Sequence, residues 1–198
     1  MLTKHQSYNE IGIDEAGRGP LIGRVYAGAV IWPEGLEPSI LIKDSKKLSQ
    51  KKRKLALLWI KENIPKWSVG YAEHNEIDEI NILEATKLAM QRAIDNLKVN
   101  MDNYELVIDG SGWYKKFPDY RVYSIVNGDN KYYSIATASI IAKEHHDDYI
   151  KELCSNNPEL DTKYGLCKNM GYGTKVHLEG IKKYGISEYH RKSFKSCK

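Results

Sequence analysis

Hydrophobic positions repeat with two different periods along this chain, and each change of period predicts a new element. Runs rich in Val, Ile and aromatic residues, bounded by Gly, Pro or Asp, are typical of strands, whereas apolar residues spaced by three and four indicate helices. We expect strands at 10–14, 21–32, 66–71, 104–110 and 121–126. We expect helices that begin at Ser49, Asn81 and Thr174, and a longer helix over about 132–153.

Local signals add detail to several of these elements. The first two strands are close enough in sequence to pair as a hairpin, and Pro33 ends the second. The helix after Ser49 stops before Pro65 and is expected to bury an apolar face of Leu55, Leu58 and Trp59. The helix capped by Asn81 has Glu84 three residues later and repeats apolar residues at helical intervals, at Ile82, Ala85, Ala89, Ala93 and Leu97.

The end of the chain has a less regular pattern. Residues 155–173 contain Pro, Gly and Asn without periodicity, so we predict a loop there. Gly185 is expected to end the helix that begins at Thr174, and the polar tail to Lys198 is expected to be mobile. Strands that alternate with helices predict an α/β fold, and 198 residues suit a single domain over residues 1–198.

The composition is that of a globular protein with a buried core. Hydrophobic residues make up 41% of the chain and charged residues 28%, and no apolar run approaches the roughly 18 residues of a membrane span. The first five residues lack a signal-peptide core. The cysteines are odd in number and lack C-x-x-C spacing, at Cys154, Cys167 and Cys197. These features indicate neither a disulfide framework nor a cysteine-rich zinc site, and they favour a reducing cytoplasm.

Basic residues are concentrated in two parts of the chain, although the net charge is only +4. Seven of the twelve residues at 43–54 are basic. A second group lies near the end, at Lys182, Lys183, Arg191, Lys192, Lys195 and Lys198. A basic stretch is commonly a solvated helix face, but two such groups beside an acidic centre favour a nucleic-acid partner.

Carboxylates follow three of the predicted strands at the point where each strand ends. Asp14 and Glu15 end the first strand, Asp109 ends the fourth, and Asp129 follows the fifth. Ends of neighbouring strands meet at one edge of an α/β sheet, so these side chains are expected to converge. The simpler alternative is that the Asp-Gly and Gly-Asp pairs are ordinary turn dipeptides, at 109–110 and 128–129.

A cluster of carboxylates is stable as anions only if cations lie among them. Oxygen ligands favour Mg²⁺ or Mn²⁺, and two such ions about 4 Å apart activate a water and stabilise the leaving oxygen of a phosphodiester. The segment Gly17-Arg18-Gly19 adds open backbone N–H groups and a guanidinium that can face a phosphate. Hydrolytic nuclease chemistry fits this combination, whereas a charged turn on a solvated edge is the simpler interpretation of the glycine-rich segment alone.

The order and spacing of the motifs resemble those of the ribonuclease HII family, the type 2 ribonucleases H. The matching segments include Gly-Ile-Asp-Glu-Ala-Gly-Arg-Gly-Pro at 12–20 and Asp-Ser-Lys-Lys-Leu-Ser at 44–49. Further matching segments lie at 81–90, 109–110, 128–131, 134–143, 171–177 and 190–194. The agreement extends from about residue 8 to residue 194, which covers nearly the whole chain.

The resemblance implies a ribonuclease H-like fold, with a central mixed sheet flanked by helices and a short C-terminal helical segment within 155–198. It implies a metal-dependent endoribonuclease that hydrolyses the RNA strand of RNA/DNA hybrids with two Mg²⁺ or Mn²⁺ ions. It also implies cleavage on the 5′ side of ribonucleotides embedded in duplex DNA, leaving 3′-hydroxyl and 5′-phosphate ends, as in ribonucleotide excision repair and DNA replication. A monomer that acts in the cytoplasm is expected.

The resemblance also assigns roles to individual residues. Catalysis and metal binding are assigned to the four acids Asp14, Glu15, Asp109 and Asp129. Recognition of the ribonucleotide 2′-hydroxyl is assigned to Gly17, Arg18 and Gly19. Tyr172 corresponds to a tyrosine that packs on the sugar at the RNA–DNA junction, although an exposed aromatic in a Gly-flanked loop is the simpler alternative. The 2′-hydroxyl distinguishes RNA from DNA, which makes such recognition physically reasonable.

Further residues are assigned to contacts around the acids. A loop that holds phosphates corresponds to Ser45, Lys46 and Lys47, for which solvation at a helix entry is the alternative. Lys143 corresponds to a lysine that supports the acids, and a surface lysine is the alternative there. His177 and His190 lie in matching segments, and we expect a structural role for them and assign neither to metal.

Several features depart from the family pattern. The usual Arg-Asp after Lys143 is His146-Asp147 here, so the contribution of that arginine is expected to be absent or pH-dependent. The segment 154–170 is longer than usual, which is expected to weaken the preference for junctions. The chain ends soon after Phe194, without the C-terminal extension of some members, so we expect weaker and more salt-sensitive binding. The N-terminus is too short for the extra domain of the type 3 enzymes.

Two other functions fit the sequence. A hybrid-binding protein would keep the fold and the basic groups without cutting, and a resolvase of the same fold would cleave all-DNA junctions. Cleavage of a duplex that contains one ribonucleotide, in Mg²⁺ but not in EDTA, distinguishes the proposed enzyme from the binding protein. Cleavage of an all-DNA junction would identify the resolvase.

Overall fold

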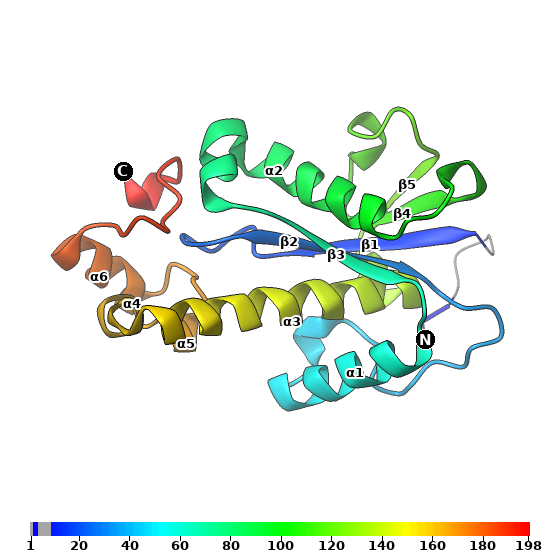
Figure 1. Ribbon diagram of the computed structural model, residues 1–198, viewed down its shortest axis with the longest axis horizontal. Coiled ribbons are helices and arrows are strands. Elements are labelled where there is room, and N and C mark those ends of the chain that lie inside the picture. The colour runs from blue at the N-terminus through cyan, green and yellow to red at the C-terminus, as the bar shows by residue number, and fades with distance from the viewer. Residues whose placement is uncertain (1, 4–8) are drawn as a thin grey trace.

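A mixed sheet forms the centre of the computed structural model, which describes residues 2, 3 and 9–198 (Figure 1). In the described residues, five strands follow the order β3–β2–β1–β4–β5. Their bounds are β1 Glu10–Ala16, β2 Val25–Ile31, β3 Trp67–Ala72, β4 Glu105–Asp109 and β5 Val122–Ile125. β2 is antiparallel to β1 and β3, whereas β4 is parallel to β1 and β5.

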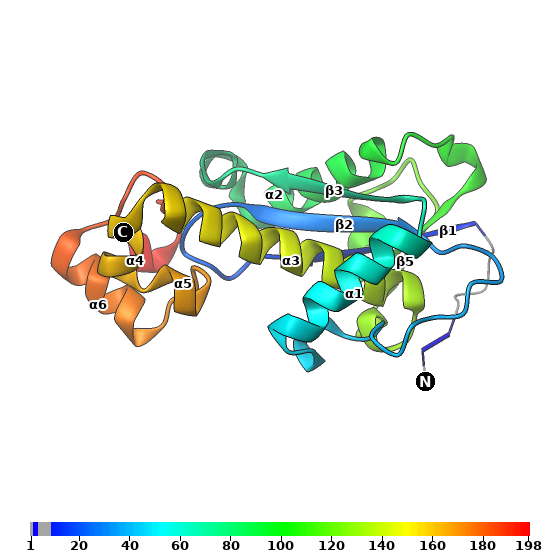
Figure 2. The same ribbon diagram turned by 60° about the horizontal axis from the view of Figure 1, so that its bottom comes forward.

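Helices cover both faces of this sheet (Figure 2). The α-helices are α1 Gln50–Asn63, α2 His74–Asn96, α3 Tyr133–Asn156, α4 Pro158–Tyr164, α5 Leu166–Asn169 and α6 Lys175–Tyr184. The 3₁₀ turns are η1 Ser45–Lys47, η2 Met101–Asn103, η3 Trp113–Lys115, η4 Gly128–Asn130 and η5 Lys195–Cys197. α2 packs on one face and α3 on the other, and α1 packs on the outer side of α3.

Apolar residues fill the spaces between the sheet and the helices. On the α2 side, strand residues such as Ile13 pack against small and apolar helix residues, at Ala85, Ala89, Met90 and Ala93. α3 lies close to the sheet because the facing residues are small, and a Cβ added at Gly12 would overlap Ser134. α3 continues past the sheet, and α4, α5 and α6 gather at that end of the molecule (Figure 2).

The predicted strands are confirmed. The strands at 10–14, 66–71, 104–110 and 121–126 correspond to β1, β3, β4 and β5 with small shifts of their ends. The hairpin of the first two strands is also confirmed, since Ile11 pairs with Ile31 and Ala16 with Tyr26 in an antiparallel register. The second strand is shorter than predicted, because residues 21–24 bend away from it and Ile22 pairs with His190 instead.

The helix after Ser49 begins and ends as predicted, but of its predicted apolar face only Trp59 packs on the core, where it stacks on Trp32. The Ser49 side chain accepts a hydrogen bond from the backbone N–H of Lys52 at 3.4 Å and caps the helix. Ala56 and Ile60 are the buried residues, whereas Leu55 and Leu58 are about half exposed. α1 packs on α3 rather than directly on the sheet, so a narrower stripe is buried than the apolar pattern suggested.

Asn81 caps a helix as predicted, but helical structure begins earlier, at His74. Asn81 has φ 68°, outside the helical region, and its side chain accepts hydrogen bonds from the backbone N–H groups of Leu83 and Glu84. The preceding turns have their own cap, in which the Glu76 side chain accepts a hydrogen bond from the Glu73 N–H. α2 therefore consists of two capped helices joined at a kink.

The prediction of a loop at 155–173 is wrong. The segment contains α4 and α5, and its buried residues pack on the end of α3, at Leu160, Tyr164 and Leu166. Both helices are shorter than two and a half turns, so neither shows the repeat that predicts a helix from sequence. The expected mobile tail is also packed: His190 pairs with Ile22, and Arg191 is fully buried.

The helices of the described residues include none that is both long and apolar enough to cross a membrane. Cys154, Cys167 and Cys197 are free thiols. The expectation that Met1 to His5 lack a signal-peptide core falls mostly outside the described residues.

Candidate active site

The parallel pairing of β1 with β4 brings two of the predicted acids together. Ile13 in β1 is the register partner of Ile108 in β4. The next residue of each strand is an aspartate, so Asp14 and Asp109 stand side by side at the same edge of the sheet. Asp14 is buried, and its carboxylate accepts a hydrogen bond from the Glu15 N–H at 2.7 Å.

The loop after β5 adds the third aspartate. The backbone N–H of Gly128 donates to Asp109 Oδ1 at 2.7 Å, which ties this loop to the end of β4. Asp129 follows and is 3% exposed, although its neighbour Asn130 lies at the surface. Its carboxylate accepts a hydrogen bond from Asn130 at 2.9 Å and lies 3.7 Å from the ammonium of Lys46. The site is therefore assembled from chain segments more than 100 residues apart.

A further buried carboxylate at the site, Asp44, was missed from the sequence. Asp44 caps η1 by accepting from the Lys46 N–H at 2.9 Å, and its second oxygen lies 3.4 Å from the Asn130 amide nitrogen. Ser139 in α3 was also missed, and its hydroxyl lies 2.8 Å from that of Ser45. In the sequence, Asp44 is an acid within a basic stretch. This position could have indicated that it caps a turn that faces the site.

Burial and mutual repulsion raise the pKa values of two aspartates of the site. Burial, with repulsion from Glu15 and Asp109, raises the pKa of Asp14 well above its usual range. Burial, with repulsion from Asp44 and Asp109, also raises the pKa of Asp129. For Lys46, burial disfavours the charged form, but the surrounding aspartates outweigh it and raise its pKa. One lysine thus faces a local excess of negative charge.

The carboxylate oxygens of the site are suitable ligands for divalent cations. Among the described residues, Glu15 Oε2 is buried and accepts no hydrogen bond, while its Oε1 accepts one from Arg18 at 3.0 Å. Burial raises the pKa of Glu15, and Arg18 offsets part of this effect. The unpartnered Glu15 oxygen lies beside acids whose pKa values are raised. The site therefore offers hard oxygen ligands whose negative charge is not balanced by the protein. Mg²⁺ and Mn²⁺ match such ligands.

A pocket of about 190 Å³ opens at these acids. Its lining includes most of the predicted substrate-binding residues, Gly17, Arg18, Gly19, Ser45, Lys46, Lys143 and Tyr172. Asp14, Glu15 and Ser139 also line it. Asp109, Asp129 and Lys47 do not line it, and the Lys47 ammonium donates a hydrogen bond to the Asn130 side chain, which in turn donates to Asp129. The structure therefore gathers the predicted residues with Lys47 at the edge.

Arg191 from the C-terminal tail holds the loop that was predicted to recognise the 2′-hydroxyl. Its guanidinium is fully buried and donates five hydrogen bonds of 2.7–3.1 Å, to the carbonyls of Gly17, Arg18, Pro20, Gly23 and Arg24. With these carbonyls turned inward, the loop keeps one conformation. Burial lowers the pKa of Arg191 to about 10, so the group stays charged near neutral pH. The polar tail pattern gave no signal for this contact.

Gly17 is required at the centre of this loop for two reasons. Its φ of 89° lies in the left-handed region, and an added Cβ would lie 2.5 Å from the His146 ring. Burial lowers the pKa of His146, so this ring is neutral near neutral pH. Asp147 is paired with the guanidinium of Arg53 in α1, at 3.0 Å. A guanidinium is thus present beside Asp147 although His146 replaces the usual arginine.

Tyr172 lines the same pocket as Asp14 and Glu15. Its ring is 42% exposed and lies next to Gly19, where an added Cβ would be 3.1 Å from the ring. The Lys143 ammonium is 5.7 Å from the ring centre and 2.8 Å from Asp147 Oδ1. Lys143 thus lies between Tyr172 and a buried charge network rather than on an open surface.

A chain of hydrogen bonds through two buried histidines holds the backbone of Tyr172. The Ser187 N–H donates to His190 Nδ1 at 2.9 Å, so the proton of neutral His190 is on Nε2. That N–H donates to His177 Nε2 at 3.0 Å, and His177 Nδ1–H donates to the Tyr172 carbonyl at 3.0 Å. Every ring nitrogen is used, and the chain requires both rings to be neutral. The expected structural role of these histidines agrees with this geometry.

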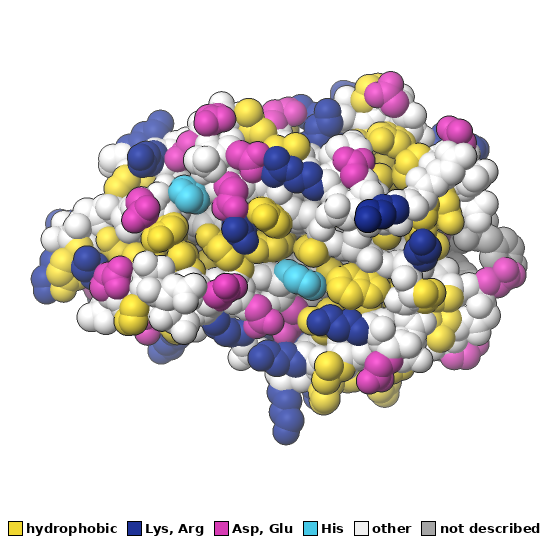
Figure 3. Space-filling view, viewed as in Figure 1, with side chains coloured by type: hydrophobic (Ala, Val, Ile, Leu, Met, Phe, Trp, Pro, Cys, Tyr) yellow, Lys and Arg dark blue, Asp and Glu magenta, His cyan; other side chains and the backbone are white. Residues whose placement is uncertain are grey.

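The basic stretch at 43–54 divides into residues near the acids and residues exposed on α1. Figure 3 shows Lys and Arg side chains gathered over the start of α1, where the exposed lysines are Lys51, Lys52 and Lys54. Arg53 is instead mostly buried, with a 2.7 Å ion pair to Glu144. The solvated-face interpretation therefore holds for three lysines of α1 but not for the whole stretch.

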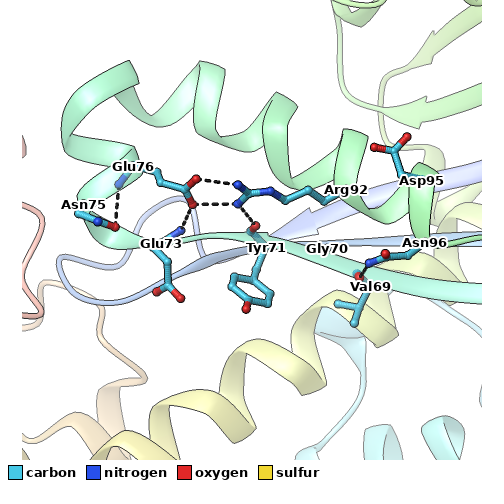
Figure 4. Close-up of a pocket in the computed structure, with 9 residues that line it drawn as sticks. All are labelled: Val69, Gly70, Tyr71, Glu73, Asn75, Glu76, Arg92, Asp95 and Asn96. Carbon is cyan, nitrogen blue, oxygen red and sulfur yellow. Dashed lines mark hydrogen bonds and ion pairs between the residues drawn. The ribbon is translucent and has the colours of Figure 1, made fainter.

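A larger hollow of about 620 Å³ lies between the edge strand β3 and α2 (Figure 4). Several of its polar groups are paired within the fold. Arg92 binds Glu76 at 2.7 Å and the Tyr71 carbonyl at 2.8 Å, and the Asn96 amide donates to the Val69 carbonyl at 2.9 Å. These contacts occupy the outer carbonyls of an edge strand and protect it from pairing with another chain. We therefore assign this hollow to the fold rather than to a site.

Comparison with known sequences identifies one family. The sequence model of the family Ribonuclease HII matches residues 11–197. The Ribonuclease HII of Rickettsia akari (strain Hartford) is 52% identical over 196 residues, which cover 98% of this chain and 95% of the relative. The Ribonuclease HII of Parabacteroides distasonis is 48% identical over 185 residues, which cover 93% of this chain and 89% of the relative.

Solved structures show the same fold. The ribonuclease H2 of Pyrococcus horikoshii OT3 has a TM-score of 0.74 and 26% identity, covering 96% of this chain and 95% of that one. Bst-RNase HIII, solved in complex with Mn²⁺, has a TM-score of 0.73 and 20% identity, covering 96% of this chain and 68% of that one. The predicted ribonuclease H-like α/β fold, with a mixed sheet flanked by helices, is therefore confirmed.

Replacing Arg191 tests whether its five hydrogen bonds hold the loop at 17–24. Arg191→Lys keeps the charge but leaves at least two carbonyls without a donor, so we expect the free energy of unfolding to fall by about 2–4 kcal/mol. Urea denaturation measures this change. Lys192→Arg, at an exposed neighbouring position, is the control and should change stability by less than about 0.5 kcal/mol. Equal effects of the two substitutions would contradict the role of Arg191.

The histidine chain predicts a loss of stability in acid. Burial, with repulsion from His177, lowers the pKa of His190 to about 4, and burial lowers the pKa of His177. The unfolded chain binds these protons below about pH 6.5, before the folded protein does, so stability is full above that pH and falls toward pH 4. The other groups of the protein also titrate, so a comparison is needed.

His190→Gln provides that comparison in thermal denaturation at pH 7.5 and pH 5. We expect the variant to be less stable than the native sequence at pH 7.5. Its Tm should nevertheless fall less on acidification, by at least about 2 °C, because one of the two titrating groups is gone. An identical acid-induced shift in both proteins would show that His190 does not contribute.

Proposed function

Because this chain belongs to the ribonuclease HII family, a family of ribonuclease H endonucleases, we propose that it is a metal-dependent endoribonuclease. In this proposal it hydrolyses the RNA strand of RNA/DNA hybrids. It also cuts on the 5′ side of ribonucleotides embedded in duplex DNA and leaves 3′-hydroxyl and 5′-phosphate ends. The observation that carries the proposal is the convergence of Asp14, Asp109 and Asp129 beside Lys46.

We assign metal binding to the four acids Asp14, Glu15, Asp109 and Asp129. When bound there, Mg²⁺ or Mn²⁺ supplies activation of a water and stabilisation of the leaving oxygen. The raised pKa values of Asp14, Glu15 and Asp129 support this assignment, because they report negative charge that the protein leaves unbalanced. Mn²⁺ is also the ion in the Bst-RNase HIII structure, which shares the fold.

The protein's own groups orient the acids. The Gly128 N–H fixes Asp109, and the Glu15 N–H fixes Asp14, so each carboxylate keeps an oxygen turned toward its neighbours. Lys46 is exposed and can bind a phosphate oxygen of the substrate next to Asp129. Ser45 is held by Ser139, which places the turn that carries Lys46 at the mouth of the pocket. These residues position the scissile phosphate against the acids.

We assign recognition of the ribonucleotide to the two sides of the pocket. Gly17, Arg18 and Gly19 present backbone N–H groups and a guanidinium on one side, and Arg191 holds them in place from behind. Tyr172 stands next to Gly19 and offers a half-exposed ring for the sugar that follows the ribonucleotide. A 2′-hydroxyl between these groups would distinguish RNA from DNA by hydrogen bonding.

The remaining proposed substrate contacts are basic. Lys143 lies beside Tyr172, and Lys47 lies at the edge near Asn130, where each can approach a duplex phosphate. We propose that the enzyme acts as a monomer. The free cysteines support a reducing compartment such as the cytoplasm.

A panel of labelled duplexes tests this function. The panel contains a duplex with one embedded ribonucleotide, a long RNA/DNA hybrid and an all-DNA junction, each with Mg²⁺, Mn²⁺ or EDTA. We expect cleavage of the first two with metal only and no cleavage of the third. Binding without cleavage would support a hybrid-binding protein, and cleavage of the all-DNA junction would support a resolvase.

Neutralising one acid tests the metal assignment. Asp14→Asn and Asp109→Asn each keep the size of the side chain but remove a charged ligand, so we expect cleavage to fall at least about 100-fold. Duplex binding, measured by fluorescence anisotropy, should change little because the basic residues are intact. Glu105→Gln serves as the control, because Glu105 lies in β4 with Asp109 but at the end of the strand far from the site. Near-normal turnover in either aspartate variant would refute the assignment.

The role of Tyr172 is tested by comparing two substrates. Tyr172→Ala should lower kcat/KM on a single embedded ribonucleotide by about tenfold more than on a long hybrid, which corresponds to about 1.4 kcal/mol of selective contact. Tyr172→Phe keeps the ring and should retain most of the selectivity. If Tyr172→Ala lowers kcat/KM by the same factor on both substrates, Tyr172 does not contribute to recognition of the junction.

A further inference from the structure

Three potential metal ligands meet where α3 ends, away from the candidate active site. Cys154 lies near the end of α3, Asp161 in α4 and Cys167 in α5, and one ligand atom of each lies within 4.8 Å of the other two. Cys154 is buried, Asp161 is partly buried and Cys167 is exposed. The sequence spacing of the cysteines had given no reason to expect such a site, because the fold of α4 and α5 creates it.

We propose that Cys154, Asp161 and Cys167 bind a soft divalent cation of the zinc class. Three side chains on three helices supply two sulfurs and a carboxylate oxygen, and the exposure of Cys167 provides access for the ion and for a solvent ligand at a fourth position. The ligand set suits zinc, since thiolates select ions of this class over Mg²⁺ and Mn²⁺. The site is therefore chemically distinct from the oxygen ligands of the four acids.

A cation uses all three side chains of this cluster, whereas a disulfide would use only two. A Zn–S distance of about 2.3 Å in tetrahedral geometry places two sulfur ligands about 3.8 Å apart. The two sulfurs already lie within 4.8 Å of each other, so an ion requires little movement. A disulfide would require the sulfurs to approach to about 2.05 Å and would give Asp161 no role. Binding of the ion releases the two thiol protons and needs no oxidant.

Asp161 is already oriented by a hydrogen bond. Its Oδ1 accepts from the backbone N–H of Cys167 at 2.8 Å, which links the carboxylate to the residue that supplies the second sulfur. Outer hydrogen bonds of this kind commonly fix the ligands of metal sites. A carboxylate has lone pairs on both oxygens, so this bond is compatible with coordination.

The cation would join three helices just before Gly171 and Tyr172. α4 and α5 are short and pack against the end of α3, so a shared ion would add a cross-link to the apolar contacts that hold them there. An ion that binds only the folded chain stabilises it by an amount that grows with the logarithm of its concentration relative to Kd. The expected effect is on the stability of the segment that positions Tyr172.

Co²⁺ serves as the spectroscopic probe for this site in the full-length, reduced protein, with excess Mg²⁺ to occupy the acids. One equivalent of Co²⁺ should produce thiolate-to-cobalt charge-transfer absorption, and one equivalent of Zn²⁺ should remove it. Zn²⁺ at about 100 times its Kd should raise the Tm by about 5 °C or more. These readouts do not depend on nuclease activity.

Matched cysteine variants separate the site from other metal binding. Cys167→Ser should abolish the absorption and the Zn²⁺-dependent rise in Tm, whereas Cys197→Ser should retain both, because Cys197 is buried elsewhere. Cys167 is exposed, so its variant should keep the metal-free Tm of the native sequence, which verifies its fold. Absence of the absorption in the native protein, or its persistence in Cys167→Ser, would overturn the proposal.

Discussion

The parallel pairing of β1 with β4 is the constraint on which the site depends. Because Ile13 is in register with Ile108, the next residue of each strand places an aspartate at the same edge of the sheet. A shift of one residue would turn Asp14 to the other face and separate it from Asp109. The buried apolar residues on both faces of β1 fix this register, so the stability of the core and the geometry of the acids have the same cause.

A second constraint is that side chains outside the pocket hold the backbone of the loop at 17–24 and of Tyr172 in position. Arg191 binds the carbonyls of the loop at 17–24, and the two histidines bind the carbonyl of Tyr172. All three groups belong to α6 or the segment after it, so the end of the chain positions both sides of the pocket. Their polar atoms are satisfied only in this arrangement, which makes it specific as well as stable.

Much of the fold and the outline of the site could be predicted from the sequence. The strands have a strong local signal in their β-branched runs, and acids at strand ends converge in any parallel sheet, so Asp14 and Asp109 were found without coordinates. Asp44 and Arg191 could not be found in this way, because their importance comes from burial by distant segments. α4 and α5 are too short for a periodic signal, and α1 buries less of its apolar face because it packs on a helix rather than on the sheet.

The central claim is that the acids at the ends of β1, β4 and the loop after β5 hold divalent ions. The most direct measurement is a titration of the protein with Mn²⁺, in which electron paramagnetic resonance detects the free ion, for the native sequence and for Asp109→Asn. We expect saturable binding of Mn²⁺ by the native protein and an affinity for Mn²⁺ at least about tenfold lower in Asp109→Asn. Equal binding by the two proteins, or no binding by the native one, would contradict it.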